Sequence, residues 1–149
     1  MTTEKYLKRL KWLENMIISR ADKIDLGRSR ATNMVVPTDR DPVQTSPRDK
    51  LSEIMSEVVD TDKELQTYKA EYKAIIAKVE TLTGEYSAAY IYLRYAKDRS
   101  VNDIARTLHI SRSTAYRVQR DALYEFEKKY GETYKQEKKC EMLTHFDTV

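Results

Sequence analysis

The chain has 149 residues, of which 34% are charged and 40% hydrophobic, and a formal net charge of +3. This length allows one domain or two small ones, and the scarcity of breakers, with three glycines and three prolines, favours an all-α fold. No apolar run approaches the roughly 18 residues that a membrane span needs. The single cysteine, Cys140, excludes an internal disulfide and fits a cytoplasmic protein.

The first predicted element is one long helix. Its apolar residues recur at alternating spacings of three and four, which is the pattern of a helix with one packed face: Tyr6, Leu10, Leu13, Ile17 and Ile24. Arg20 interrupts this seam, and the sequence LGRSR around Gly27 is a possible break. Residues 36–48 hold all three prolines and are expected to form a loop, either a plain connector or a functional segment.

A second long helix follows with a cleaner heptad pattern. It opens at Ser46-Pro47 or with Asp49 as N-cap, and Gly84 is expected to end it. The stripe runs through Leu51, Ile54, Val58, Thr61, Leu65, Tyr68, Tyr72, Ile75, Val79 and Leu82, of which only Thr61 is polar. Two such helices most economically form an antiparallel, coiled-coil-like helical hairpin over residues 1–83. The same stripes also allow a homodimer, and sequence alone does not separate the two arrangements.

Charge divides the chain in a similar way. Residues 49–82 hold five Lys or Arg against eight Asp or Glu, so the second helix is acidic and a poor partner for nucleic acid. Residues 83–130 hold nine against six and are basic. We expect a second domain at 84–130, ended by Gly131, and a polar C-terminal tail at 131–149.

The stretch SVNDIARTLHISRSTAYRVQRDAL, residues 100–123, predicts two short helices joined by a tight turn. Ser100 and Asp103 form a capping box that starts a helix at Val101. The turn residues are His109, Ile110 and Ser111, and Ser111 caps the next helix. Ile104, Ala105, Leu108, Ala115, Val118, Ala122 and Leu123 are predicted to face inward. This spacing matches a helix-turn-helix, with histidine at the turn position where glycine is common.

The outward face of the second helix is rich in DNA-contacting side chains. Arginine pairs bidentately with guanine, serine and glutamine reach other base edges, and tyrosine contacts a phosphate or a thymine methyl. Our candidate double-stranded DNA contacts are Arg112, Ser113, Tyr116, Arg117 and Arg120, with Ser111 at a phosphate; Gln119 is also expected to face outward. The alternative is that these arginines only solvate the outer face of a core helix.

The segment YSAAYIYLRYAKDRS, residues 86–100, is expected to supply a supporting helix. Tyr90, Leu93 and Tyr95 are predicted packing residues. Arg94 and Lys97 either reach the DNA backbone or are simply exposed.

Residues 90–128 resemble region 4 of bacterial sigma factors. The two share the order of their motifs: a helix with the sequence LRY, a helix with IA followed by L, a helix start with Ser-Arg, and an Ala-Leu pair near the end. That resemblance implies promoter-element readout by the second helix and contact with RNA polymerase. Together with the loop sequence DPVQTSPRDKLSEIM, the chain resembles phage and prophage sigma-like regulators, related to ArpU-type late transcription regulators. The resemblance implies control of phage genes without the segment that melts a promoter, so a complete sigma factor is not expected.

Other functions are less well supported by the sequence. Two histidines and one cysteine give no spacing for a metal or a nucleophile and its base, and no glycine-rich phosphate loop is present, so we expect neither an enzyme nor a cofactor. A small terminase subunit for DNA packaging remains an alternative, although such proteins usually place the DNA-binding domain first. A protein-interaction adaptor that uses the hairpin is another.

Overall fold

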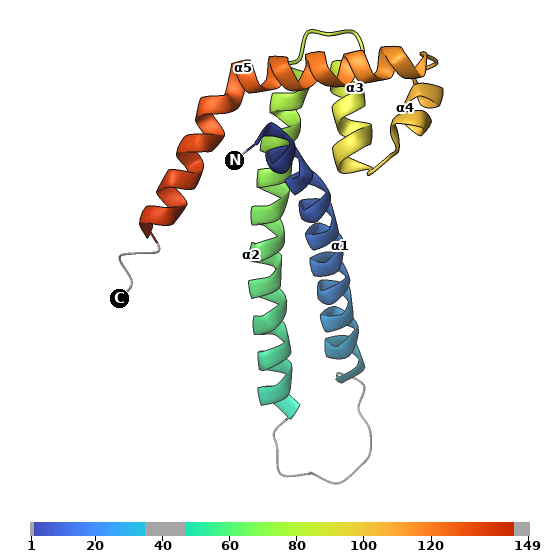
Figure 1. Ribbon diagram of the computed structural model, residues 1–149. Helices are drawn as coiled ribbons and strands as arrows, with labels where there is room; N and C mark the ends of the chain where they lie inside the picture. The colour runs from blue at the N-terminus through green and yellow to red at the C-terminus, as the bar shows by residue number, and fades with distance from the viewer. Residues whose placement is uncertain (1, 35–46, 145–149) are drawn as a thin grey trace. The chain divides into compact units, whose positions relative to one another are not determined.

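The computed structural model describes residues 2–34 and 47–144, and these residues form helices without any strand (Figure 1). The elements are α1 (Thr3–Met34), α2 (Pro47–Glu80), α3 (Ser87–Ile91), the π-helix η1 (Tyr92–Ala96), α4 (Val101–Thr107) and α5 (Arg112–Thr144). The all-α expectation is therefore confirmed. In this part of the chain, no helix has both the length and the apolar character needed to cross a membrane. Most of the loop expected at 36–48 lies outside the described residues.

The helices belong to two compact units. One contains the described residues of 13–71, and the other combines residues 2–12 with the described residues from 72 onward. The long helices α1 and α2 each contribute to both units. The second unit is thus discontinuous in sequence.

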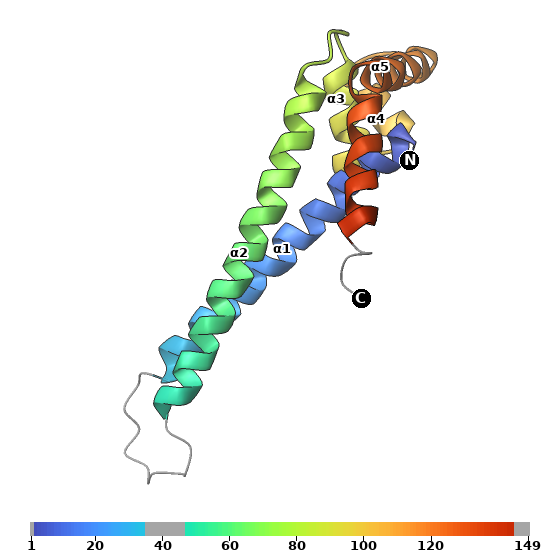
Figure 2. The same ribbon diagram turned by 90° about the vertical axis from the view of Figure 1, so that its left-hand side faces the viewer.

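In the unit formed by residues 13–71, α1 and α2 run side by side in opposite directions, as both views show (Figures 1 and 2). Ile24, Val58 and Leu65 form the buried cluster between them. Arg20, the polar residue in the seam of α1, places its Nε 2.7 Å from Glu64 Oε2. This ion pair explains how an arginine is accommodated where the heptad calls for an apolar side chain.

The possible break at Gly27 does not occur, because α1 is continuous from Thr3 to Met34. A Cβ atom on Gly27 would lie only 2.5 Å from Val58 Cγ2, so this glycine allows α1 to approach α2 closely. Thr61, the polar residue in the stripe of α2, is buried and donates its hydroxyl to Glu57 O at 2.8 Å. The one polar side chain of the stripe is therefore satisfied without a partner from α1.

In the second unit, the start of α1 packs on the C-terminal half of α5. The rings of Tyr6 and Tyr134 are stacked with centroids 4.9 Å apart, and Phe126 lies 6.0 Å from Tyr6. Thr3 Oγ1 and Tyr134 Oη are hydrogen-bonded at 2.8 Å, and Lys78 Nζ of α2 donates to Tyr6 Oη at 3.0 Å. Aromatic packing and a hydrogen bond therefore join the start of α1 to α5, and a second hydrogen bond joins it to the end of α2.

Two expected helix ends are wrong. The helix α2 ends at Glu80, before Gly84, and Leu82 is buried in the connection that follows. The helix α5 does not end at Gly131 but runs on to Thr144, so the tail expected from residue 131 is helical to that point. A glycine inside a helix costs only about 1 kcal/mol, and the burial of Tyr134 one turn later offsets this cost.

The connection from α2 to α3 is fastened to α5 by a polar cluster. Glu125 Oε1 accepts hydrogen bonds from Thr83 N and Thr83 Oγ1, both at 2.9 Å, and lies 2.8 Å from Lys129 Nζ. Lys129 Nζ also donates to Thr81 O at 2.7 Å. The hydrogen bond from Lys129, followed by that from the Thr83 amide, lowers the pKa of Glu125 from 4.5 to about 2.

Candidate nucleic-acid interface

The candidate interface lies on α4, the turn after it and the first turns of α5. Its core consists of Tyr90, Ile104, Ala105 and Ala115, which are all buried. The partly buried side chains packed against this core are Leu93, Val101, Leu108, Ile110 and Val118. Ala105 and Ala115 are small residues at the crossing of α4 and α5, where they leave room for the two backbones to approach. The inward-facing residues predicted for this stretch, including Ala122, are confirmed as buried or partly buried.

Helix α4 begins at Val101, as the capping-box pattern predicts. Asp103 N donates to Ser100 Oγ at 3.2 Å, and Ser100 Oγ donates to Asp103 Oδ2 at 2.6 Å. The hydrogen bond from the Ser100 hydroxyl is the largest cause that lowers the pKa of the Asp103 carboxyl. The capping pair fixes the start of α4 and uses the carboxylate of Asp103 locally.

The turn after α4 has the geometry of a Schellman motif. His109 N donates to Arg106 O at 3.3 Å, and Ile110 N donates to Ala105 O at 3.0 Å. His109 has a φ of 54°, in the left-handed region that glycine usually occupies at this place. The predicted left-handed turn is confirmed, with histidine in it.

Ser111 caps α5. Its hydroxyl accepts from Thr114 N at 3.1 Å, and its carbonyl accepts from Ala115 N at 2.9 Å. The same hydroxyl lies 2.7 Å from Thr114 Oγ1 and 3.1 Å from Ser113 Oγ. Because α5 starts from this capped turn on a buried core, its first turns have a defined direction.

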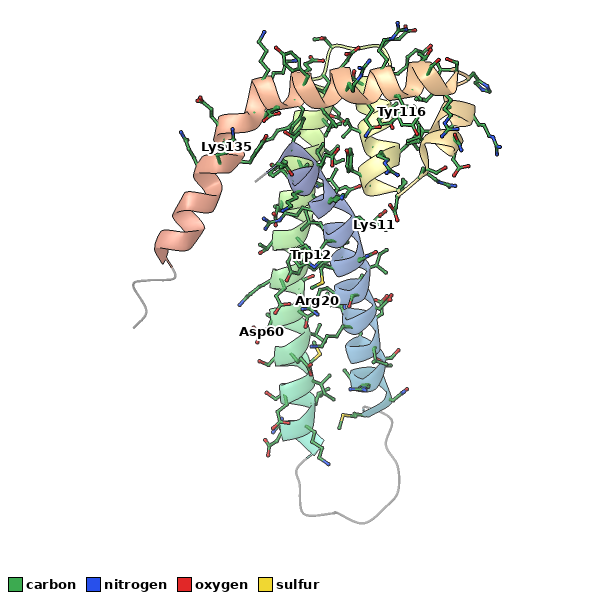
Figure 3. All side chains as sticks on the ribbon, in the orientation of Figure 1. Lys11, Trp12, Arg20, Asp60, Tyr116 and Lys135 are labelled. Atoms are coloured by element: carbon green, nitrogen blue, oxygen red, sulfur yellow. The ribbon has the colours of Figure 1, made fainter. Side chains whose placement is uncertain are left out.

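The five candidate side chains on α5 are all exposed: Arg112, Ser113, Tyr116, Arg117 and Arg120. Tyr116 is 45% exposed on this part of α5 (Figure 3), and the Arg112 guanidinium lies 5.8 Å from the centroid of its ring. Residues at positions 112, 113, 116, 117 and 120 of a helix share one face, so these groups form a continuous basic and aromatic surface. We refer to these five residues as the α5 outer face.

Gln119 does not belong to the α5 outer face. Its Oε1 accepts a hydrogen bond from Tyr90 Oη at 3.0 Å, which turns the amide toward α3, so the outward position expected for Gln119 is wrong. Tyr90 and Tyr95 are buried, as predicted for packing residues. Burial is the main reason that the pKa of Tyr95 is raised to about 12.

The two further cations considered for the DNA backbone have local contacts. Arg94 Nη1 donates to Arg99 O at 2.9 Å, and Lys97 Nζ lies 5.6 Å from the centroid of the Tyr92 ring.

Sequence reasoning did not single out Arg106 as a surface residue beside the turn. Together with Arg112 and His109 it lines a shallow surface hollow, completed by Asn102, Ala105 and Ile110. The position of Arg106, three residues before His109, could have indicated from sequence that it lies beside the turn.

Within residues 2–34 and 47–144, no group of three or more His, Cys, Asp or Glu side chains is placed to hold a metal ion. In comparisons with known proteins, no family model, no curated sequence and no solved structure matches the chain. The chemistry of the α5 outer face and its supporting turn is therefore the basis for assigning a function.

Proposed function

We propose that this chain is a sequence-specific, double-stranded-DNA-binding transcription regulator. In this proposal residues 84–130 form a helix-turn-helix domain of the sigma region 4 type, preceded by an antiparallel helical hairpin. The second helix enters the major groove and presents the α5 outer face to base edges and phosphates. The resemblance to phage and prophage regulators extends the proposal to promoters used by the host RNA polymerase.

The observation that carries the proposal is the two-sided character of α5. Its outer face exposes three arginines, a serine and a tyrosine, while Ala115 and Ala122 on the opposite side are fully buried. A helix that only covers a core needs no such concentration of guanidinium groups. Arginine and serine are side chains that pair with guanine and with other base edges, and phosphates add affinity irrespective of sequence.

The test is a pull-down of fragments of the source genome by the purified protein at about physiological salt, followed by sequencing. Salt matters because nonspecific phosphate contacts dominate when it is low. Enrichment of one or two sites just upstream of a gene cluster is the expected result. Even retention of all fragments, or of none, would contradict promoter recognition by the protein alone.

A matched pair of variants connects any enrichment to the α5 outer face. The double variant Arg117→Ala/Arg120→Ala removes two arginines from it and should lose the enrichment. The double variant Arg28→Ala/Arg30→Ala removes two exposed arginines from α1 and should keep it. Equal enrichment by both variants would place recognition elsewhere on the chain.

A further inference from the structure

The hollow beside the turn gathers three groups that bind anions. Arg106 comes from α4, His109 from the turn and Arg112 from the first turn of α5. Asn102, Ala105 and Ile110 complete the lining, so no carboxylate is among the described residues that form it. Asp103, the acid of α4, is hydrogen-bonded to Ser100 instead. The hollow is thus a small cationic surface next to the α5 outer face.

The backbone holds the imidazole in this place at some cost. A non-glycine residue is disfavoured in the left-handed region because its Cβ atom crowds the following carbonyl oxygen. Glycine would relieve this strain at a φ of 54° but would carry no side chain. The hydrogen bonds of His109 N and Ile110 N fix the turn, and hence the direction of the bond from Cα to Cβ. The histidine therefore adds a donor to the hollow that the common glycine would lack.

We propose that this hollow binds one phosphate group of the DNA backbone, and that His109 makes this contact dependent on pH. The proposal rests on the proposed function and adds a site that extends beyond the α5 outer face to the turn and α4. Arg106 is a permanent cation of this site, and Arg112 belongs both to it and to the outer face. Protonated His109 supplies a third positive charge and a charge-assisted hydrogen bond.

The direction of the pH effect follows from the negative charge of the phosphate that the hollow is proposed to bind. Arg106 and Arg112 are the charged groups that line the hollow with the imidazole. A phosphate in the hollow favours protonation, so DNA binding takes up a proton and becomes tighter as pH falls. Histidine is the side chain that ordinarily changes charge between about pH 5 and 8.

Because a phosphate contact carries no sequence information, the test uses a fluorescent duplex of mixed sequence that spans several helical turns. Affinity is measured by anisotropy over a series of salt concentrations, at about pH 5.5 and about pH 7.5, on the two sides of the usual imidazole range. The unchanged protein should bind the duplex at least about three times more tightly at the lower pH than at the higher pH. The slope of log affinity against log salt should also become steeper, by up to about 0.9, the value for one fully neutralised phosphate.

The variant His109→Gly should lose both effects, and because glycine suits the turn, it should not lose stability. His145→Asn alters the other histidine of the chain and should keep both effects. Equal pH dependence in the unchanged protein and His109→Gly, or no pH dependence in either, would overturn the proposal. Enrichment of a genomic site without this pH dependence would overturn this inference alone, whereas no duplex binding at any pH would overturn the proposed function as well.

A second arm separates DNA phosphate from free phosphate. The imidazole NMR signal that disappears in His109→Gly reports on the hollow. It should shift when the duplex is added and stay in place when inorganic phosphate is added at the same phosphate concentration and ionic strength. A shift with inorganic phosphate only would mean a site for free anions and would contradict the assignment to DNA.

Discussion

Arg117 is the residue of the α5 outer face whose replacement gives the most direct test of base readout. It is exposed, and it lies one turn beyond Ser113 on the same face of α5. We expect Arg117→Ala to weaken binding to an enriched site by about 1–3 kcal/mol if it pairs bidentately with a base, and to relax preference at that base. Titration of the site and of single-base variants at fixed salt measures both. Arg30→Ala is the control, and unchanged affinity with unchanged preference would remove Arg117 from the interface.

Ser111 is a single residue that is expected to contribute to the stability of the fold as the N-cap of α5. Its hydroxyl accepts from Thr114 N at 3.1 Å at the start of α5. Ser111→Ala should lower the free energy of unfolding by about 1 kcal/mol, the usual value of an N-cap, whereas Ser111→Gly should cost only about a few tenths. Urea unfolding followed by circular dichroism measures the difference. An alanine variant as stable as the glycine variant would mean that the cap contributes little.

Among the elements, the connection between α2 and α3 is held to α5 by Glu125. Its pKa in the folded protein is lowered to about 2 from 4.5, first by the hydrogen bond from Lys129. The carboxylate therefore stabilises the fold fully above about pH 4.5, and this contribution is lost as pH falls toward 2. Glu125→Gln should be less stable than the unchanged protein at neutral pH, and the difference should shrink in that window. Glu132→Gln, exposed on the same helix, should give a small difference at every pH; parallel behaviour of the two variants would contradict this role.

The two helical glycines of α1 and α5 should respond to alanine in opposite ways. At Gly27 the new Cβ would lie 2.5 Å from Val58 Cγ2, so overpacking of about 1–3 kcal/mol outweighs the gain of about 1 kcal/mol in helix propensity. At Gly131 the nearest atom is Glu127 Cγ at 3.3 Å, on an exposed flexible side chain, so the propensity gain should prevail. Thermal unfolding compares the two variants. Adding Val58→Ala should partly rescue Gly27→Ala, and no rescue would mean that the strain arises elsewhere.

The sequence predicts those features of the elements that depend on local chemistry. The caps at Ser100 and Ser111 follow from side chains that reach backbone groups three residues away, and both are confirmed. The helix end predicted at Gly131 is wrong because Tyr134 packs against Tyr6, a contact that no local sequence pattern reveals. Gln119 was misplaced for a similar reason, since its partner Tyr90 lies on another helix. Periodicity could place Gln119 near the edge of the exposed face but could not identify this partner.

For the whole molecule, the main consequence is that the unit carrying the α5 outer face is not contiguous in sequence. It includes residues 2–12, whose contacts reach the far half of α5 through Thr3, Tyr6 and Tyr134. A fragment cut at residue 84, at the start of the basic domain expected from sequence, would lack these contacts. We therefore expect the start of α1 to be required for the stability of α5. The two segments are distant in sequence, since Thr3 and Tyr134 are 131 positions apart.

Tyr6→Ala tests this dependence. Tyr6 is 5% exposed, and truncation of a buried large aromatic side chain typically costs about 3–5 kcal/mol. Hydrogen exchange should become faster at the amides of Phe126–Tyr134 on α5, because the ring that covers this stretch is gone. Tyr124→Ala is the matched control, since its side chain is 71% exposed on the same helix and should leave exchange unchanged. If both variants exchange like the unchanged protein, the Tyr6 ring does not hold this stretch of α5 in place.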